Sequence, residues 1–470
     1  MAFNDLSFLF IFFPAALLLH KLMPQIGKNL ILLLLSLLFF AWGSPTYVLL
    51  LLLLILFNYL SGLQIAVQKR SRNRKAARLT LISAVAVNLL LLGFFKYWGF
   101  VLENVNALLH TSFSVQAHTM PLGVSFFTFS ILSYLFDVYR DKAPVATNIL
   151  EFSLFVTFFP KLVSGPIVQY ADMAEQIRSR KQTSDQFRTG CQLFLIGLSK
   201  KVLLSNTIGT TFYAVTALPM NEISVVIAWL GAVAYALMLY FDFSGYSDMA
   251  IGLGQMFGFT FRKNFDYPYT SASITEFWRR WHISLGAWFR DYVYIPLGGS
   301  RVSLLCTIRN LLIVWLLTGI WHGASWNFIA WGIYYGLLLL IEKFLLKRVL
   351  DRLPNKIRVL GTLLFVLIGW VFFFSPSLGS AFAWLGKMFG VGAAGFLGAT
   401  AKYYLAGSWL TLLIGSYAAS PRGAQLGRRL IHHGSRKIVL LAVLWYTALF
   451  LLCIAGMMRS TYTSFLYFQF

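Results

Sequence analysis

Residues 317–326 read L-T-G-I-W-H-G-A-S-W and join two apolar runs, 311–321 and 324–341. Apolar runs that together exceed about 20 residues are typical of helices within a lipid bilayer. His322 lies between the runs, and an ionisable ring there costs desolvation energy unless it contacts polar partners, water or substrate. The stretch therefore predicts membrane helices with a candidate functional histidine between them.

The whole chain has the composition of a polytopic membrane protein. Of its 470 residues, 58% are hydrophobic and 12% are charged, and apolar stretches recur from residue 6 to residue 458. At roughly 20 residues per crossing, these stretches predict on the order of ten spans, some of them broken. The first stretch follows Asp5 rather than a basic region, so we expect a retained helix and not a signal peptide. We expect one all-α membrane domain over residues 1–470, with 459–470 as a tail outside the membrane.

The charge of the chain follows the positive-inside rule. The formal net charge is +23, but the cations lie in short loops between apolar runs, so nucleic-acid binding is not expected. The two basic loops, 69–78 and 422–437, are predicted to be cytoplasmic. They are either topology signals alone or also attract an anionic donor. Counting crossings from these loops places both the N-terminus and the C-terminus outside.

Two segments do not have the pattern of simple spans. Residues 151–170 contain F-P-K-L-V-S-G-P, whose prolines and glycine break a helix, so we expect a re-entrant loop that lines a cavity. In residues 273–292, Ser273 and Glu276 form a predicted capping box that begins one helix ending near Tyr292. Its apolar stripe predicts an interfacial helix, either structural or contacting a donor. The stripe comprises Phe277, Trp281, Leu285, Trp288 and Tyr292, with Arg279, Arg280 and Arg290 elsewhere on the helix.

His322 has the properties of a general base. The eleven residues of the run before it cover roughly 16 Å, about half of a 30 Å hydrocarbon core, so substrate would reach it only through a funnel or cavity. A neutral imidazole there can take a proton from a hydroxyl that attacks an acyl carbonyl. A satisfied core histidine, a proton relay and a substrate gate are the alternatives. Gly319 and Gly323 would let backbone or substrate approach closely.

The remaining polar residues offer fewer candidates. His282, on the aromatic-basic helix, is the second candidate histidine, whereas five others are expected to be solvated at membrane edges or in loops: His20, His110, His118, His432 and His433. No metal site is expected, since no zinc-binding spacing of histidines or cysteines occurs, and we expect the three cysteines, Cys191, Cys306 and Cys453, to pack in the core. Asp242 and Asp248 lie in or beside an apolar run, where they would orient a histidine, pair with an arginine such as Arg279, or form a local cap or ion pair.

Several long strings in the chain resemble the membrane-bound O-acyltransferase family, and within it the bacterial AlgI-type subgroup of alginate O-acetylation. The likeness covers most of the chain. The matching strings are P-L-G-V-S-F-F-T-F at 121–129, F-D-F-S-G-Y-S-D-M-A-I-G-L-G at 241–254, S-I-T-E-F-W-R-R-W-H-I-S-L at 273–285, R-D-Y-V-Y-I-P-L-G-G at 290–299 and G-I-W-H-G-A at 319–324.

The resemblance implies a fold of about ten or more membrane helices around a central funnel, and it implies acyl transfer. His322 matches the family's catalytic histidine and His282 its second motif histidine. The expected donor is cytosolic acetyl-CoA or an acyl carrier protein, with no bound cofactor. The expected recipient is a cell-surface polysaccharide, and the expected partner is an extracytoplasmic acetyltransferase that modifies it. The protein itself is expected in the lipid of the bacterial inner membrane. Residues expected to bind substrate or donor are Trp321, Arg279, Trp281, Asp242 and Asp248.

The C-terminal residues 465–470, F-L-Y-F-Q-F, are similar to a terminal motif of this subgroup in which the tyrosine is a proposed acyl carrier. Tyr467 is therefore a candidate acyl acceptor or relay, with an aromatic interface anchor as the alternative. Two other functions also fit intramembrane polar residues: a transporter or flippase of lipid-linked sugars, and a scaffold of an envelope polysaccharide machine that has no chemistry of its own.

Overall fold

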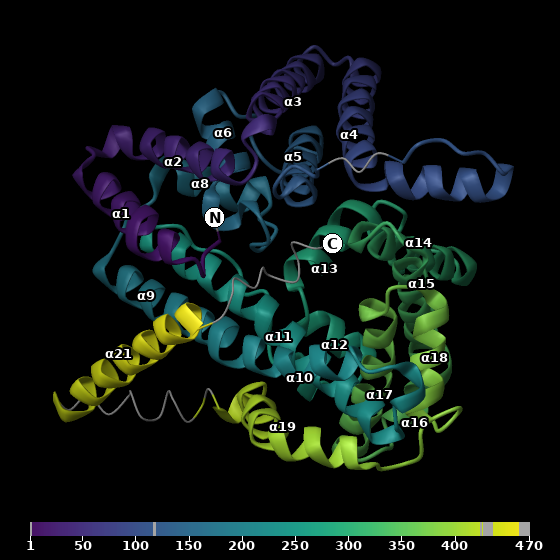
Figure 1. Cartoon of the computed structure of the whole chain (residues 1–470). Helices are drawn as coiled ribbons and strands as arrows, with labels where there is room; N and C mark the ends of the chain where they lie inside the picture. Colours follow the sequence, from purple (N-terminus) through teal and green to yellow (C-terminus); the bar gives the residue numbers. More distant parts are fainter. Residues whose placement is uncertain (1, 116–118, 424, 426–435, 460–470) are drawn as a thin grey trace. The chain divides into compact units, whose positions relative to one another are not determined.

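The computed structural model describes residues 2–115, 119–423, 425 and 436–459 (Figure 1). All regular secondary structure in these residues is helical. The predicted all-α class is confirmed. Eight helices in these ranges are long and apolar enough to cross a membrane, and two shorter apolar helices add to them. The eight are Gln25–Gly43, Pro45–Arg70, Arg74–Leu109, Val225–Met256, Leu304–His322, Trp326–Leu350, Asn355–Phe374 and Ile438–Arg459, and the two shorter helices are Phe8–Leu22 and Val124–Tyr139.

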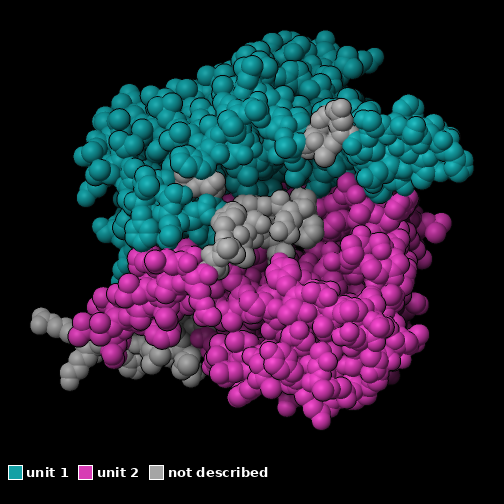
Figure 2. All heavy atoms as spheres, in the orientation of Figure 1, with its two compact units in different colours: residues 1–194, 249–262 teal, residues 195–248, 263–470 magenta. Residues whose placement is uncertain are grey.

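The chain divides into two compact units that alternate along the sequence (Figure 2). Unit 1 comprises Met1–Phe194 and Met249–Arg262, and unit 2 comprises Leu195–Asp248 and Lys263–Phe470. The divisions at 194/195 and 248/249 fall inside the helices α9 (Ser184–Ser199) and α11 (Val225–Met256). Neither unit is therefore a single stretch of sequence.

Unit 1 holds polar contacts between apolar helices. Asn58 and Asn88 are buried, and their side-chain amides exchange hydrogen bonds of 3.2 and 2.7 Å. Such amide pairs join helices where no water is present to satisfy them. The helices of this unit include α1 (Phe13–Leu22), α2 (Lys28–Gly43), α3 (Val48–Arg70), α4 (Arg74–Leu109), α5 (Val124–Tyr139), α6 (Ile149–Thr157), α7 (Phe159–Leu162) and α8 (Tyr170–Ser179), with the π-helix η1 (Phe8–Phe12) before α1.

The predicted break in residues 151–170 is present. The helix stops at Phe158, whose φ of −48° and ψ of 108° separate α6 from the single turn α7. Pro160 lies in the first turn of α7, where its missing N–H needs no partner. Lys161 is buried in this turn, with Nζ 3.2 Å from the hydroxyl oxygen of Ser130 and 4.2 Å from the ring centre of Phe155.

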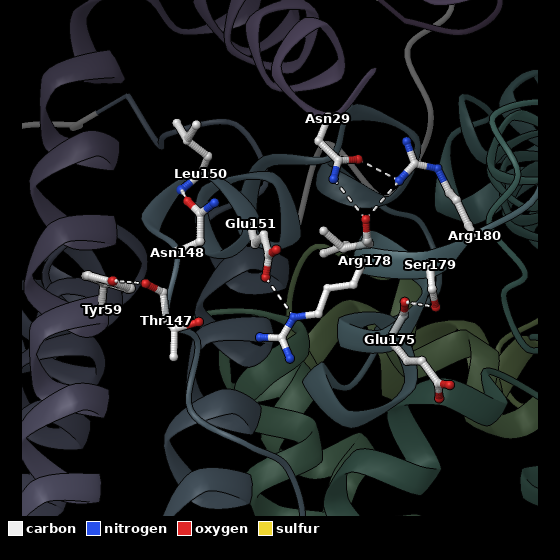
Figure 3. A network of polar contacts seen from close by, with 11 residues as sticks. Asn29, Tyr59, Thr147, Asn148, Leu150, Glu151, Glu175, Arg178, Ser179 and Arg180 are labelled. Carbon is white, nitrogen blue, oxygen red and sulfur yellow. Dashed lines mark hydrogen bonds and ion pairs between the residues drawn. The ribbon is translucent and has the colours of Figure 1, made fainter. Parts of the chain in front are cut away.

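A polar network fixes the C-terminal end of α8 against α2 and α6 (Figure 3). The guanidinium of Arg180 donates to the side-chain oxygen of Asn29 over 2.6 Å, and the amide of Asn29 donates to the carbonyl of Ile177 over 2.8 Å. Arg178 forms an ion pair of 2.9 Å with Glu151. Burial lowers the pKa of Arg180 to about 10, so this guanidinium stays charged at neutral pH.

Unit 2 is built around the antiparallel pair α14 (Leu304–His322) and α15 (Trp326–Ile341). A Cβ added to Gly319 would lie 2.3 Å from the carbonyl oxygen of Phe328, and one on Gly332 would lie 2.5 Å from that of Trp315. The glycines therefore serve close backbone approach between these helices. The other helices of this unit include α10 (Asn206–Thr216), α12 (Ile274–Arg280), α13 (Ile283–Phe289), α16 (Lys347–Leu350), α17 (Asn355–Phe374), α18 (Leu378–Met388), α19 (Ala399–Ala418), α21 (Arg436–Arg459) and the π-helices η4 (Lys200–Ser205), η7 (Arg290–Tyr294) and η8 (Glu342–Leu346).

The single helix predicted for residues 273–292 is wrong, although its first turn is correct. Ser273 caps α12 by accepting a 3.0 Å hydrogen bond from the backbone N–H of Glu276. The helix then ends at an extended Trp281 and a left-handed His282, with φ of +46°. The backbone N–H of Ile283 donates instead to the carbonyl of Asn264, 2.9 Å away. A contact distant in sequence thus divides this segment into α12 and α13.

The aromatic stripe predicted for this segment is nonetheless buried. All five of its residues are at most 5% exposed: Phe277, Trp281, Leu285, Trp288 and Tyr292. Two smaller predictions are wrong. His20 is buried, with its ring edge-on to that of Phe257 at 5.2 Å, and Cys191 is exposed rather than packed in the core.

Candidate active site around His322

His322 is the last residue of α14, and aromatic rings surround its imidazole. Its ring centroid lies 4.9 Å from that of Trp331, 5.0 Å from that of Trp321 and 5.3 Å from that of Phe373. Each pair is nearly perpendicular, and the side chain is 5% exposed. The position at a helix C-terminus, where backbone carbonyls point outward, stabilises a positive charge that develops on the ring.

A small pocket borders the imidazole of His322. No part of it is wide enough for a water molecule. Entry of an acyl group therefore requires the aromatic side chains to move. The lining residues are Leu239, Trp281, His322, Trp331, Trp370 and Phe373.

The depth of His322 in the membrane stays a prediction. α14 begins at Leu304, seven residues before the apolar run used for the estimate, but Arg309 lies in its second turn. The guanidinium of Arg309 donates to the side chain of Asn310 over 3.0 Å, and Asn310 bonds the carbonyls of Leu297 and Gly299. The uninterrupted apolar part of α14 therefore still begins near residue 311.

His282 is buried in the same unit, 2% exposed, and its ring lies edge-on to that of Phe243 at 4.7 Å. Its Nδ1 lies 3.3 Å from the side-chain oxygen of Asn264, which also accepts hydrogen bonds from the backbone N–H and hydroxyl of Ser284. Burial lowers the pKa of His282 to about 3, so the ring is neutral near pH 7. The ring of Trp321 lies 6.1 Å from His282 and 5.0 Å from His322, so one indole contacts both histidines.

The two aspartates of the string 241–254 pair with consecutive lysines of η4. Asp242 lies 2.5 Å from Nζ of Lys201, and Asp248 lies 2.6 Å from Nζ of Lys200. The first pair is almost completely buried, and the second is about one-fifth exposed. A π-helix turn places side chains differently from an α-helix, and here neighbouring lysines both reach α11. The carboxylates thus form ion pairs, but with lysines 41 and 48 positions away in the sequence rather than with Arg279 or a local partner.

The structure places the other candidate residues in different surroundings. Trp281 lines the pocket beside His322, and Trp321 is 5% exposed between the two histidines. Arg279 is exposed on α12. Tyr467 lies outside the described residues. Roles of these residues in binding a donor or substrate stay predictions.

Sequence reasoning missed the residues that complete the pocket, above all Trp331, Trp370 and Phe373. Trp331 lies nine positions after His322 on the next helix, and the other two lie near the end of α17. In a membrane helix, an aromatic residue that faces protein and one that faces lipid have the same hydropathy. A signal did exist for Lys201, since carboxylates within an apolar run need partners and Lys200 and Lys201 directly follow another apolar stretch.

Comparison with known proteins gives a family match over most of the chain. The sequence pattern of the MBOAT, membrane-bound O-acyltransferase family, matches residues 36–380. The matched region contains both histidines, both aspartates and the lining residues of the pocket.

Individual relatives extend this match. The chain is 44% identical over 398 residues to a probable alginate O-acetylase, AlgI, of Pseudomonas aeruginosa, which covers 83% of this chain and 75% of the relative. It is 36% identical over 427 residues to a peptidoglycan O-acetyltransferase of Helicobacter pylori, covering 83% and 80% of the two chains. A teichoic acid D-alanyltransferase of Bacillus subtilis is 26% identical over 308 residues, covering 62% and 75%.

Proposed function

This chain belongs to the membrane-bound O-acyltransferase family, and from that premise we propose that it moves an acetyl group from a cytosolic thioester toward a cell-surface polysaccharide. The observation that carries the proposal is the position of His322, an imidazole at a small aromatic pocket in a helix pair of the membrane domain. Two relatives that each match 83% of the chain are named a probable alginate O-acetylase and a peptidoglycan O-acetyltransferase. Both names join acetyl transfer to an envelope polymer.

In the proposed reaction, His322 acts as the general base. A hydroxyl gives its proton to the imidazole while its oxygen attacks the carbonyl carbon of the thioester. The C-terminus of α14 stabilises the imidazolium that forms, and this cation then protonates the departing thiolate. The aromatic rings exclude water, which would otherwise hydrolyse the thioester.

The size of the pocket favours a short acyl group. Space for the acyl group arises only when aromatic side chains move, and each added methylene would require a larger displacement. An acetyl group needs the least. His282, held neutral by burial, supports the site through the indole of Trp321, which contacts both imidazoles.

The proposed orientation follows the charges of the loops. The basic loop 69–78, between α3 and α4, lies in the cytoplasm, so the thioester, either acetyl-CoA or an acyl carrier protein, approaches from that side of a bacterial inner membrane. Both termini then lie outside. Tyr467, in the terminal F-L-Y-F-Q-F, accepts the acetyl group there and passes it to an extracytoplasmic acetyltransferase that modifies the polymer.

The test is surface acetylation in cells that lack the chromosomal gene and carry single variants. His322→Ala is expected to abolish acetylation because the base is lost, and Tyr467→Phe is expected to abolish it because the acceptor hydroxyl is lost. His110→Asn is a matched control, since His110 is exposed and has a left-handed conformation that asparagine tolerates. Full acetylation with His322→Ala at equal expression would overturn the catalytic proposal, and full acetylation with Tyr467→Phe would remove the relay alone.

A further inference from the structure

The pocket beside His322 contains a hydrogen-bond donor for which the protein supplies no acceptor within the described residues. Trp331 is 0% exposed, and its indole nitrogen Nε1 lacks a hydrogen-bond partner there. Burial of an N–H without an acceptor costs free energy, so fold requirements alone disfavour a donor at this position.

Two other indoles of the same unit have acceptors. Nε1 of Trp229 donates to the carbonyl of Met388 over 2.8 Å, and Nε1 of Trp384 donates to that of Ala228 over 3.2 Å. Tyr335, Trp278 and Trp370 also carry polar atoms that lack partners among the described residues. Tyr335 and Trp278 do not line the pocket, and Trp370 lines it from α17 without the ring contact that joins Trp331 to His322. Trp331 combines an unsatisfied donor with a place in the pocket and direct ring contact with His322, 4.9 Å between centroids.

The helix pair holds Trp331 and His322 in a fixed relation. His322 ends α14, and Trp331 lies in the second turn of α15. Gly319, three residues before the histidine, and Gly332, directly after Trp331, bring the two backbones together, with no room for a Cβ at either position. A donor held on rigid elements can stabilise charge without reorganisation during the reaction.

We propose that the indole N–H of Trp331 donates a hydrogen bond to the carbonyl oxygen of the acyl group and stabilises the oxyanion of the tetrahedral intermediate. The inference rests on the proposed acyl transfer. As the acceptor oxygen bonds to the carbonyl carbon, the π electrons of the carbonyl move to its oxygen and the hydroxyl proton moves to His322. The carbonyl then re-forms, the carbon–sulfur bond breaks, and the thiolate takes the proton from His322. Trp331 is thus a catalytic residue of the proposed reaction that keeps its own proton throughout.

The test compares turnover of acetyl-CoA, followed as release of the CoA thiol, by the full-length protein in proteoliposomes that also contain the extracytoplasmic acetyltransferase and an acceptor polysaccharide. Trp331→Phe keeps an aromatic edge against His322 but removes the donor, and it is expected to lower kcat about tenfold to a hundredfold with KM for acetyl-CoA unchanged. Replacement of Trp331 by 3-benzothienylalanine, which has the shape of tryptophan with sulfur in place of N–H, is expected to give the same loss. The pH profile of kcat should keep its shape because His322 remains the base.

The matched control is Tyr335→Phe. This change removes a different buried donor, the phenol hydroxyl of Tyr335, which also lacks a partner among the described residues. Tyr335 lies on the same helix and in the same aromatic cluster but outside the pocket, so kcat should stay within twofold. Retention of wild-type kcat by either Trp331 variant would overturn the proposal. If Trp331→Phe alone lowered kcat, the indole would act through its packing and not through its N–H. Absence of turnover in the wild-type protein would instead refute the proposed function, and this inference with it.

Discussion

Acidification should destabilise the protein through His282. Burial lowers the pKa of this imidazole from 6.5 to about 3, so the folded state resists the proton that the unfolded state accepts. The stability that the neutral ring provides is complete above pH 6.5, declines as the pH falls and is lost by about pH 3. Between pH 7.5 and pH 5, the linkage relation gives a loss of about 2 kcal/mol for this one residue.

The loss can be isolated by comparing wild type with His282→Asn in detergent at pH 7.5, 6 and 5. Asparagine tolerates the left-handed conformation at this position, φ of +46°, and does not titrate. The unfolding free energy of the wild type should fall by about 2 kcal/mol more than that of the variant between pH 7.5 and pH 5, because the contributions of other groups cancel. Melting temperatures at each pH provide the readout.

A parallel pH dependence in the two proteins would refute the reasoning. It would mean that the imidazole of His282 reaches solvent or an acidic partner and titrates normally when folded. The magnitude at pH 5 does not depend on the exact folded pKa, since any value well below 5 gives nearly the same loss. The comparison therefore tests the burial of this ring.

Two further changes test the packing of unit 2. Asp242→Asn should destabilise the protein by about 3–5 kcal/mol because it leaves Lys201 as a buried cation. The second substitution Lys201→Met should then restore most of the lost melting temperature. An unchanged melting temperature in the single variant would show that the pair is solvated. Gly319→Ala should lower both melting temperature and acyl transfer because its Cβ would lie 2.3 Å from a backbone oxygen of α15, whereas Gly361→Ala, with open space around it, should change neither measurably; equal effects would contradict the helix contact.

The helices could be predicted from the sequence where the signals are local. Hydropathy located the apolar helices, and the cap at Ser273 is present where the residue types indicate it. The break at His282 could not be predicted, because neither Trp281 nor His282 is a helix breaker. It depends on backbone and side-chain bonds to Asn264, which lies outside the helical pattern.

The candidate site was predictable only in part. An ionisable ring between apolar runs identified His322, because few reasons other than function place a histidine there. The pocket depends on Trp331 from α15 and on Trp370 and Phe373 from α17, whose hydropathy does not reveal which side of the helix faces protein. The pairing of Asp242 with Lys201 likewise depends on the π-helical turn of η4, which no local sequence pattern predicts.

The most direct measurement of the central claim is transfer of radiolabelled acetyl groups from acetyl-CoA by the purified full-length protein in proteoliposomes with the extracytoplasmic acetyltransferase and an acceptor polysaccharide. Wild-type protein should transfer label, and His322→Ala and His322→Gln should both lose transfer. His322→Gln, which fills most of the space of the imidazole, should keep a melting temperature near that of the wild type. Label transferred at the wild-type rate by either variant would contradict the assignment of His322 as the general base.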